Sequence, residues 1–199
     1  MKLDVLIRTY DAPPVSEREI LRYAGCREAD PTVEALLHTC FAEAEPKLTY
    51  QVCYRELPVK IADGVCDFGC FSVTSAKLSK QLNGCKNVLL LGATVGIGLD
   101  QLIARYGKIS PAKALLFQAI GAERIEALCD AFGEDFEAET HTKLRSRFSP
   151  GYGDLPMDVQ KDIFSVLDPT RHIGLFLTDR LLMSPTKSVT AFIGIESNI

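Results

Sequence analysis

The sequence lacks any long apolar segment. Its longest apolar runs, such as Val88–Leu91, fall far short of the roughly 18–20 residues that a membrane-spanning helix requires. The first residues, MKLDVLIRTYDAPP, are charged from the second position and contain neither the apolar core nor the small-residue cleavage site of a secretory signal. We therefore expect a cytoplasmic protein with no membrane partner.

The chain also lacks an excess of positive charge. It has 22 Lys and Arg against 26 Asp and Glu, a formal net charge of −4 and a pI near 5.4. No broad basic surface is implied, so we expect no nucleic-acid partner. With 47% hydrophobic and 24% charged residues, the composition is that of a soluble globular protein. We expect a single domain over residues 1–199, with residues 1–47 forming a helical segment packed on the rest.

A metal site lacks the ligands that it would need. Cys66 and Cys70 lie four residues apart in VCDFGC, but no second close Cys/His pair completes a zinc site. Residues 65–73 alternate as a strand does, which predicts that both thiols share a core face with Phe68. The acidic run Glu134–Glu139 is interpreted as a solvated helix face rather than a metal site.

The pattern of periodicities favours an α+β fold, with a central, mostly antiparallel twisted sheet and surrounding helices. The sequence predicts strands near residues 3–7, 48–73, 87–91 and from 173 onward, ending with 189–195. It predicts helices over residues 16–25, 31–46, 76–83, 99–106, 110–133 and 156–167, with 134–146 also helical. Strand-rich blocks separated by groups of helices do not form regular βαβ units.

The segment LLLGATVGIGLD, residues 89–100, has some features of a dinucleotide-binding loop. A buried strand is followed by Gly92, Gly96 and Gly98 and then a helix, which could offer backbone N–H groups to a pyrophosphate. The spacing is G-x-x-x-G-x-G, and no second strand follows the helix. The alternative is a strand-to-helix turn in which glycine permits close packing. A nucleotide-dependent oxidoreductase would require a parallel sheet around Gly92.

The segment RSRFSPGYGDLP, residues 145–156, gathers arginines, a proline, two turn glycines and a tyrosine. An arginine fork binds a carboxylate in a bidentate manner, a glycine-rich turn offers backbone groups, and an aromatic ring covers an apolar or cationic group. This combination suits a zwitterionic, amino-acid-like ligand. The alternative is a surface loop whose arginine caps the preceding helix.

The stretch RFSPGYGDLPMDVQKDIFSVLD resembles the Arg-Pro-x-Pro-Gly-Tyr loop and following helix of the activation domain of vitamin B12-dependent methionine synthase, although Phe148 stands where that family has proline. The similarity continues through HIGLFLTDRLLMSPTKSVTAFIGI, where it includes Ile173-Gly174, Leu177-Thr178, Met183, Pro185 and Ser188-Val189. That domain binds S-adenosylmethionine. The resemblance is specific over residues 147–195 and weaker upstream.

The resemblance implies a set of site residues. Arg147 would hold the methionyl carboxylate of S-adenosylmethionine. Tyr152, as the catalytic residue, would lie near the sulfonium methyl group and face the cobalamin. Glu126 on the long helix would be the acidic ligand, with the neighbouring Ala127 as the alternative equivalent. The backbone would line the ligand at the three positions before the tyrosine, Ser149, Pro150 and Gly151.

The resemblance also implies a function, namely the reductive reactivation of a cobalamin-dependent methionine synthase by a separate subunit or activating protein. S-adenosylmethionine would be the methyl donor to the corrinoid cobalt. The cobalamin would be reached only through a partner, a corrinoid-binding methionine synthase, with a flavodoxin-like protein as the electron donor. The alternative is a non-catalytic binding module of the same fold that docks on a corrinoid protein or binds another amino-acid-like ligand. The family's late tyrosine has no counterpart here, which favours the alternative.

Overall fold

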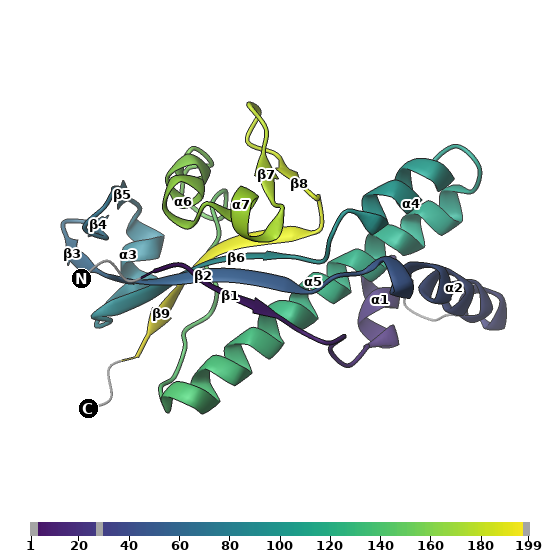
Figure 1. The fold of residues 1–199 in the computed structure, drawn as a ribbon, viewed down its shortest axis with the longest axis horizontal. Coiled ribbons are helices and arrows are strands. Elements are labelled where there is room, and N and C mark those ends of the chain that lie inside the picture. The colour runs from purple at the N-terminus through teal and green to yellow at the C-terminus, as the bar shows by residue number, and fades with distance from the viewer. Residues whose placement is uncertain (1–3, 27–29, 197–199) are drawn as a thin grey trace.

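The computed structural model describes residues 4–26 and 30–196 of the chain. Its centre is a four-stranded sheet in which every pairing is antiparallel (Figure 1). The spatial order is β1 (Leu6–Thr9), β2 (Gln51–Pro58), β6 (Asn87–Thr94) and β9 (Ser188–Ile195). The expected α+β class and antiparallel sheet are therefore confirmed.

Helices cover both faces of this sheet. The long helix α5 (Pro111–Thr140) runs diagonally beneath it, with α1 (Glu17–Tyr23), α2 (Pro31–Ala44) and α4 (Gly98–Tyr106) grouped around its N-terminal half (Figure 1). The opposite face carries α3 (Ala76–Leu82), α6 (Val159–Leu167) and α7 (Pro169–Ile173). Because both faces of the sheet are covered, β6 carries apolar side chains on both of its faces. Its sequence is therefore a continuous apolar run rather than an alternating one.

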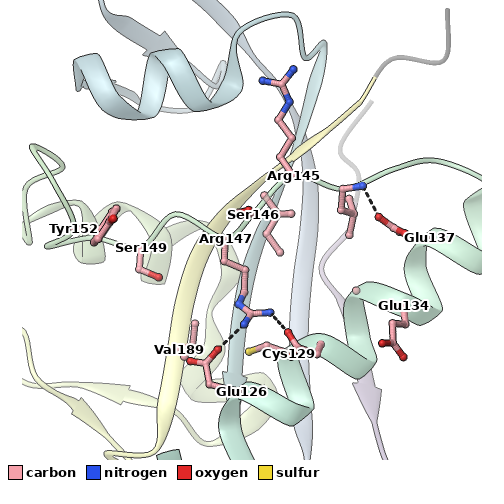
Figure 2. A pocket seen from close by; sticks show the side chains of 14 residues that line it. Glu126, Cys129, Glu134, Glu137, Arg145, Ser146, Arg147, Ser149, Tyr152 and Val189 are labelled. Carbon is pink, nitrogen blue, oxygen red and sulfur yellow. Dashed lines mark hydrogen bonds and ion pairs between the residues drawn. The ribbon is translucent and has the colours of Figure 1, made fainter. Parts of the chain in front are cut away.

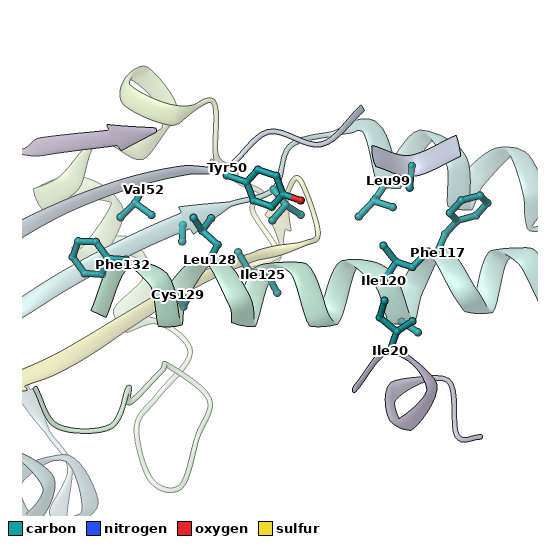
Figure 3. Packing of buried hydrophobic residues seen from close by; sticks show 14 of the residues in the cluster. Ile20, Tyr50, Val52, Leu99, Phe117, Ile120, Ile125, Leu128, Cys129 and Phe132 are labelled. Carbon is teal, nitrogen blue, oxygen red and sulfur yellow. The ribbon is translucent and has the colours of Figure 1, made fainter. Parts of the chain in front are cut away.

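Two separate groups of buried side chains follow from the two faces. On the α5 side, the ring of Tyr54 from β2 lies 4.9 Å from that of Phe132, within a cluster that extends along α5 to Phe117 and Ile20 (Figure 3). On the other side, the rings of Phe68 and Phe192 stack at 5.0 Å. The sheet is thus the middle layer of a three-layer arrangement.

The helix boundaries follow local signals in the sequence. The Ser16 hydroxyl accepts a hydrogen bond from the backbone N–H of Glu19 and caps α1. Proline occupies the first turn of α2 and of α5, where its missing N–H costs nothing. Helix α5 continues past Gly133 to Thr140 and stops at His141, which adopts a left-handed conformation with φ 54°. Residues 141–146 were expected to be helical, and this part of the prediction is wrong.

The remaining elements are short. A 3₁₀ turn (Glu45–Lys47) follows α2, and a small meander contains β3 (Lys60–Ala62), β4 (Val65–Asp67) and β5 (Ser72–Thr74). The hairpin of β7 (Phe176–Leu177) and β8 (Met183–Ser184) projects from the α6 side (Figure 1).

The cysteine prediction for the meander is correct for Cys66 and wrong for Cys70. Cys66 and Phe68 are buried, whereas Cys70 is exposed, because β4 ends at Asp67 and the chain turns at Gly69, where φ is +80°. Over the described residues, no group of His, Cys, Asp and Glu is arranged to hold a metal ion.

The glycine-rich segment after β6 does not form a dinucleotide site. Gly92 lies inside β6, which has antiparallel partners on both sides, so the parallel sheet that such a site needs is missing. A Cβ at Gly96 would meet the Thr49 side chain, and one at Gly98 would overlap the backbone oxygen of Lys47. These glycines permit close packing, which was the alternative interpretation.

No helix in the described part of the chain is long and apolar enough to cross a bilayer.

Candidate functional site

The candidate arginine lies on an irregular strand segment beside β9. Leu144 pairs with Ile195 and Phe148 with Phe192. The two pairs are therefore four residues apart along this segment but only three residues apart along β9. One extra residue is therefore accommodated between the two pairs, as in a β-bulge. Bulges re-aim side chains and are frequent beside functional sites.

The bulge separates the neighbouring side chains. Phe148 is buried among the side chains on the α6 side, whereas Arg147 points to the opposite face and reaches α5. Arg145 turns away toward α3, where its Nη1 donates to the backbone oxygen of Gln81 at 2.6 Å (Figure 2). The backbone N–H of Phe148 donates to the Phe192 oxygen at 2.9 Å, a bond that a proline at this position could not make.

A pocket of about 640 Å³ lies between α5, this segment and β9 (Figure 2). Acidic groups line its α5 wall, polar and aromatic groups its opposite wall, and aliphatic groups of β9 its floor. Its lining residues are Glu126, Cys129, Asp130, Gly133, Glu134 and Glu137 from α5, Leu144, Arg145, Ser146, Arg147, Ser149 and Tyr152 from the facing segment, and Val189 and Ile193 from β9.

The guanidinium of Arg147 is held from α5 by two carboxylates. Its Nη2 donates to Glu126 at 2.5 Å and its Nη1 to Asp130 at 2.7 Å. Residues 126 and 130 are one helical turn apart and share a face of α5. Burial alone would lower the pKa of Arg147, but these two carboxylates raise it above its ordinary value, so the guanidinium remains charged.

A thiol lies at the base of the same pocket. Cys129 is buried, and burial raises its pKa to about 12. A thiol with such a pKa remains protonated at neutral pH and is a poor nucleophile. It therefore contributes an apolar surface beneath Arg147 rather than a reactive group.

A tight turn follows Arg147 and forms one end of the pocket. The backbone N–H of Tyr152 donates to the Ser149 oxygen at 3.1 Å and that of Gly151 to the Leu155 oxygen at 2.9 Å. Gly151 has φ +85°, and a Cβ there would overlap the Met157 sulfur. The positive φ favours glycine at this position, and a larger residue would also have to displace the Met157 side chain.

The turn is fixed to α3 by one carboxylate. Asp154 accepts hydrogen bonds from the Ser75 hydroxyl at 2.5 Å and the backbone N–H of Ala76 at 2.8 Å. These bonds, first that of Ser75, lower the pKa of Asp154. Negative charge at a helix N-terminus is also favourable.

Tyr152 is displayed at the end of the turn. Its side chain is 68% exposed, and its ring meets that of Phe148 edge-on at 5.3 Å. A large aromatic ring held in solvent by a hydrogen-bonded turn is available for contact with a ligand or a partner.

The structure brings four of the predicted site residues to one pocket: Glu126, Arg147, Ser149 and Tyr152. Pro150 and Gly151 do not line it and instead shape the turn, with Pro150 buried.

Sequence reasoning did not assign Asp130 or Glu134 to the site. Their spacing of four residues from Glu126 onward was the signal that could have identified them, because it places all three on one helical face. Glu134 and Glu137, predicted to belong to a solvated face, border the pocket.

No protein-family model matches this sequence, and no curated protein matches it either. Its structure is similar to a solved structure described as the MetH reactivation domain bound to AdoHcy, with a TM-score of 0.67 and 14% sequence identity. The similarity covers 96% of this chain and 78% of that chain. The chain therefore has the fold of the MetH reactivation domain.

Proposed function

We propose that this chain binds S-adenosylmethionine in the α5 pocket and presents its methyl group to a corrinoid held by a partner methionine synthase, as part of the reductive reactivation of that enzyme. The observation that carries the proposal is the position of Arg147. It pairs with Glu126 and Asp130 at the wall of an open pocket, beside the turn that ends in Tyr152. The fold is that of a reactivation domain whose solved structure holds AdoHcy.

The pocket fits the chemical groups of this ligand. Its volume of about 640 Å³ lies within the range of roughly 300–1,000 Å³ that is usual for small-molecule sites. Arg147 offers a fork for the α-carboxylate. Glu126 and Asp130 offer negative charge to the ammonium and sulfonium groups, and Leu144 and Ile193 offer apolar surface to the adenosine.

Each residue of the site has a role in holding and orienting. Arg147 fixes the amino-acid end of the ligand, and the backbone around Ser149 contacts it from the facing wall. Tyr152 lies at the open end of the pocket, where a partner's corrinoid would approach. Bound there, S-adenosylmethionine supplies an activated methyl group. The protein needs no general base for such a transfer, because its contribution is the positioning of the two reactants.

Isothermal titration calorimetry with S-adenosylmethionine tests the proposal directly. We expect binding by the native chain, weakened by roughly 1.5–3 kcal/mol in Arg147→Ala, the range for hydrogen bonds to a charged group. Arg145→Ala is the matched control, because it removes the same charge two residues away from a guanidinium directed at α3. This control should change the affinity far less.

The alternative function predicts a different result. A non-catalytic module that docks on a corrinoid protein would bind that protein but not S-adenosylmethionine, either alone or in the complex. The exposure of Tyr152 fits both functions. Absence of ligand binding by the native chain, both with and without a corrinoid-bearing methionine synthase, would reject the proposed function in favour of the alternative.

A further inference from the structure

The guanidinium of Arg147 already pairs with other side chains of the protein. Both terminal nitrogens of Arg147 donate to carboxylates, Nη2 to Glu126 and Nη1 to Asp130. Arginine binds a carboxylate most strongly as a fork of two parallel N–H groups. A ligand carboxylate that binds the fork of the two terminal nitrogens therefore competes with the carboxylates of α5 for the guanidinium.

The two carboxylates differ in how easily they can leave. The side chain of Asp130 is 64% exposed, whereas that of Glu126 is 44% exposed and that of Arg147 only 26%. Asp130 also makes the longer of the two contacts. Because a displaced Asp130 is already largely hydrated, its release carries the smaller desolvation cost.

We propose that Asp130 is an exchangeable counter-ion that gives the pocket a preference for ligands with a net positive charge. It holds Arg147 in the free chain. When the ligand carboxylate takes the guanidinium, Asp130 turns to the cationic groups of the ligand. This inference rests on the proposed function and specifies which ligand charge the site selects.

The preference follows from the sum of charges. Glu126, Asp130 and Arg147 together carry one net negative charge. S-adenosylmethionine, with a carboxylate, an ammonium and a sulfonium, carries one net positive charge and neutralises the cluster. S-adenosylhomocysteine has a neutral sulfur and leaves the cluster negative. The pocket therefore binds the methyl donor more tightly than the demethylated product, which assists product release.

The test compares the affinities of Asp130→Asn and the native chain for both nucleosides by titration calorimetry. Removal of the competitor for Arg147 should tighten the binding of S-adenosylhomocysteine. The ratio of the two dissociation constants should move toward the product by about two- to fivefold, the range that corresponds to an exposed ion pair. Circular dichroism checks that the exposed substitution leaves the fold intact.

Glu134→Gln is the matched control. Glu134 lines the same pocket, but in the described part of the chain it makes no ion pair, so it does not compete for Arg147. Its removal should weaken S-adenosylmethionine slightly without tightening S-adenosylhomocysteine. A gain for the product in this variant as large as that in Asp130→Asn would overturn the exchange.

The outcomes distinguish a failure of the counter-ion exchange from a failure of the proposed function. An unchanged ratio in Asp130→Asn, or an equal loss for both nucleosides, would overturn the exchange and leave the proposed function standing. Failure of the native chain to bind either nucleoside would remove both.

Discussion

Two arginine–carboxylate clusters involve the same helix, α5, but differ in burial and in how fully their hydrogen-bonding groups are used. Arg124 is completely buried. Its nitrogens donate to both oxygens of Glu123 and to the backbone oxygens of Pro13 and Pro14. Arg147 is part-exposed and donates to the half-exposed Glu126 and the exposed Asp130. The first cluster is saturated by protein acceptors, and the second retains N–H groups and solvent access for a ligand.

The difference shows how one chemical pair can serve two purposes. The cluster around Arg124 holds the chain before α1 against α5, and the backbone N–H of Ser16 adds a bond to Glu123 at 2.9 Å. Because the cluster around Arg124 is buried, each charge in it needs its partner, and a single charge left unpaired would be strongly destabilising. Exposure makes the pairing of Arg147 exchangeable.

The largest expected effect is that of breaking the buried cluster. Arg124→Met should lower the free energy of unfolding by about 3–5 kcal/mol, the range for removal of one partner of a buried ion pair. The reason is that the buried Glu123 carboxylate and the oxygens of Pro13 and Pro14 all lose the donors that Arg124 provides. Urea denaturation followed by circular dichroism measures the change.

The double variant Arg124→Met/Glu123→Gln is the control for this experiment. It removes the stranded charge while the Gln oxygen can still accept from Ser16, so part of the stability should return. A loss below about 1 kcal/mol in the single variant, the value of a surface pair, would show that the two clusters do not differ as described.

The cluster around Arg147 should lose much less stability than the cluster around Arg124 when its arginine is removed. Arg147→Ala should lower the free energy of unfolding by only about 0–1 kcal/mol, because its partners stay hydrated when the guanidinium is removed. The same urea experiment measures this change, with Arg147→Lys as the charge-preserving control. A loss as large as that of Arg124→Met would make Arg147 a structural anchor and weaken its assignment to ligand binding.

Much of the fold could be predicted from the sequence because its signals are local. Ser16 caps α1, Asp30 and Pro31 begin α2, and Ser110-Pro111 begins α5, and each of these acts within one helical turn. The apolar run after Asn87 likewise marks the buried strand β6. The sequence did not reveal where that strand ends, because its last residues pair with distant β2 and β9.

The site was harder to predict because its geometry depends on contacts between distant residues. The sequence pointed to Arg147 and Tyr152, but the bulge opposite β9 is visible only once the register of residues 144–148 is known. The pairing of Arg147 with Asp130 joins residues seventeen apart. The helical spacing of Glu126 and Asp130 predicts a shared face but does not say what that face meets.

The carboxylate of Asp154 shares one property with each cluster and so separates the effect of burial from that of hydrogen-bond saturation. Like Glu123 it is satisfied by protein donors, the Ser75 hydroxyl and the N–H groups of Ala76 and Lys77, but like Asp130 it is exposed. If burial rather than saturation makes an anchor, Asp154→Asn should have the smallest effect on stability of the three changes. Thermal denaturation measures it.

The pH dependence of Asp154 sharpens this last test. The hydrogen bond from Ser75 and those from the α3 backbone lower its pKa below the ordinary 3.8. Its contribution to stability is therefore fully present above pH 3.8 and is lost as the pH falls through the lower, folded-state pKa. The amide proton shifts of Ala76 and Lys77, followed by NMR, should titrate with a midpoint below 3.8 in the native chain and not in Asp154→Asn. A midpoint at or above 3.8 would mean that the α3 donors do not favour the charged form, and the turn that carries Tyr152 would then lack this attachment in solution.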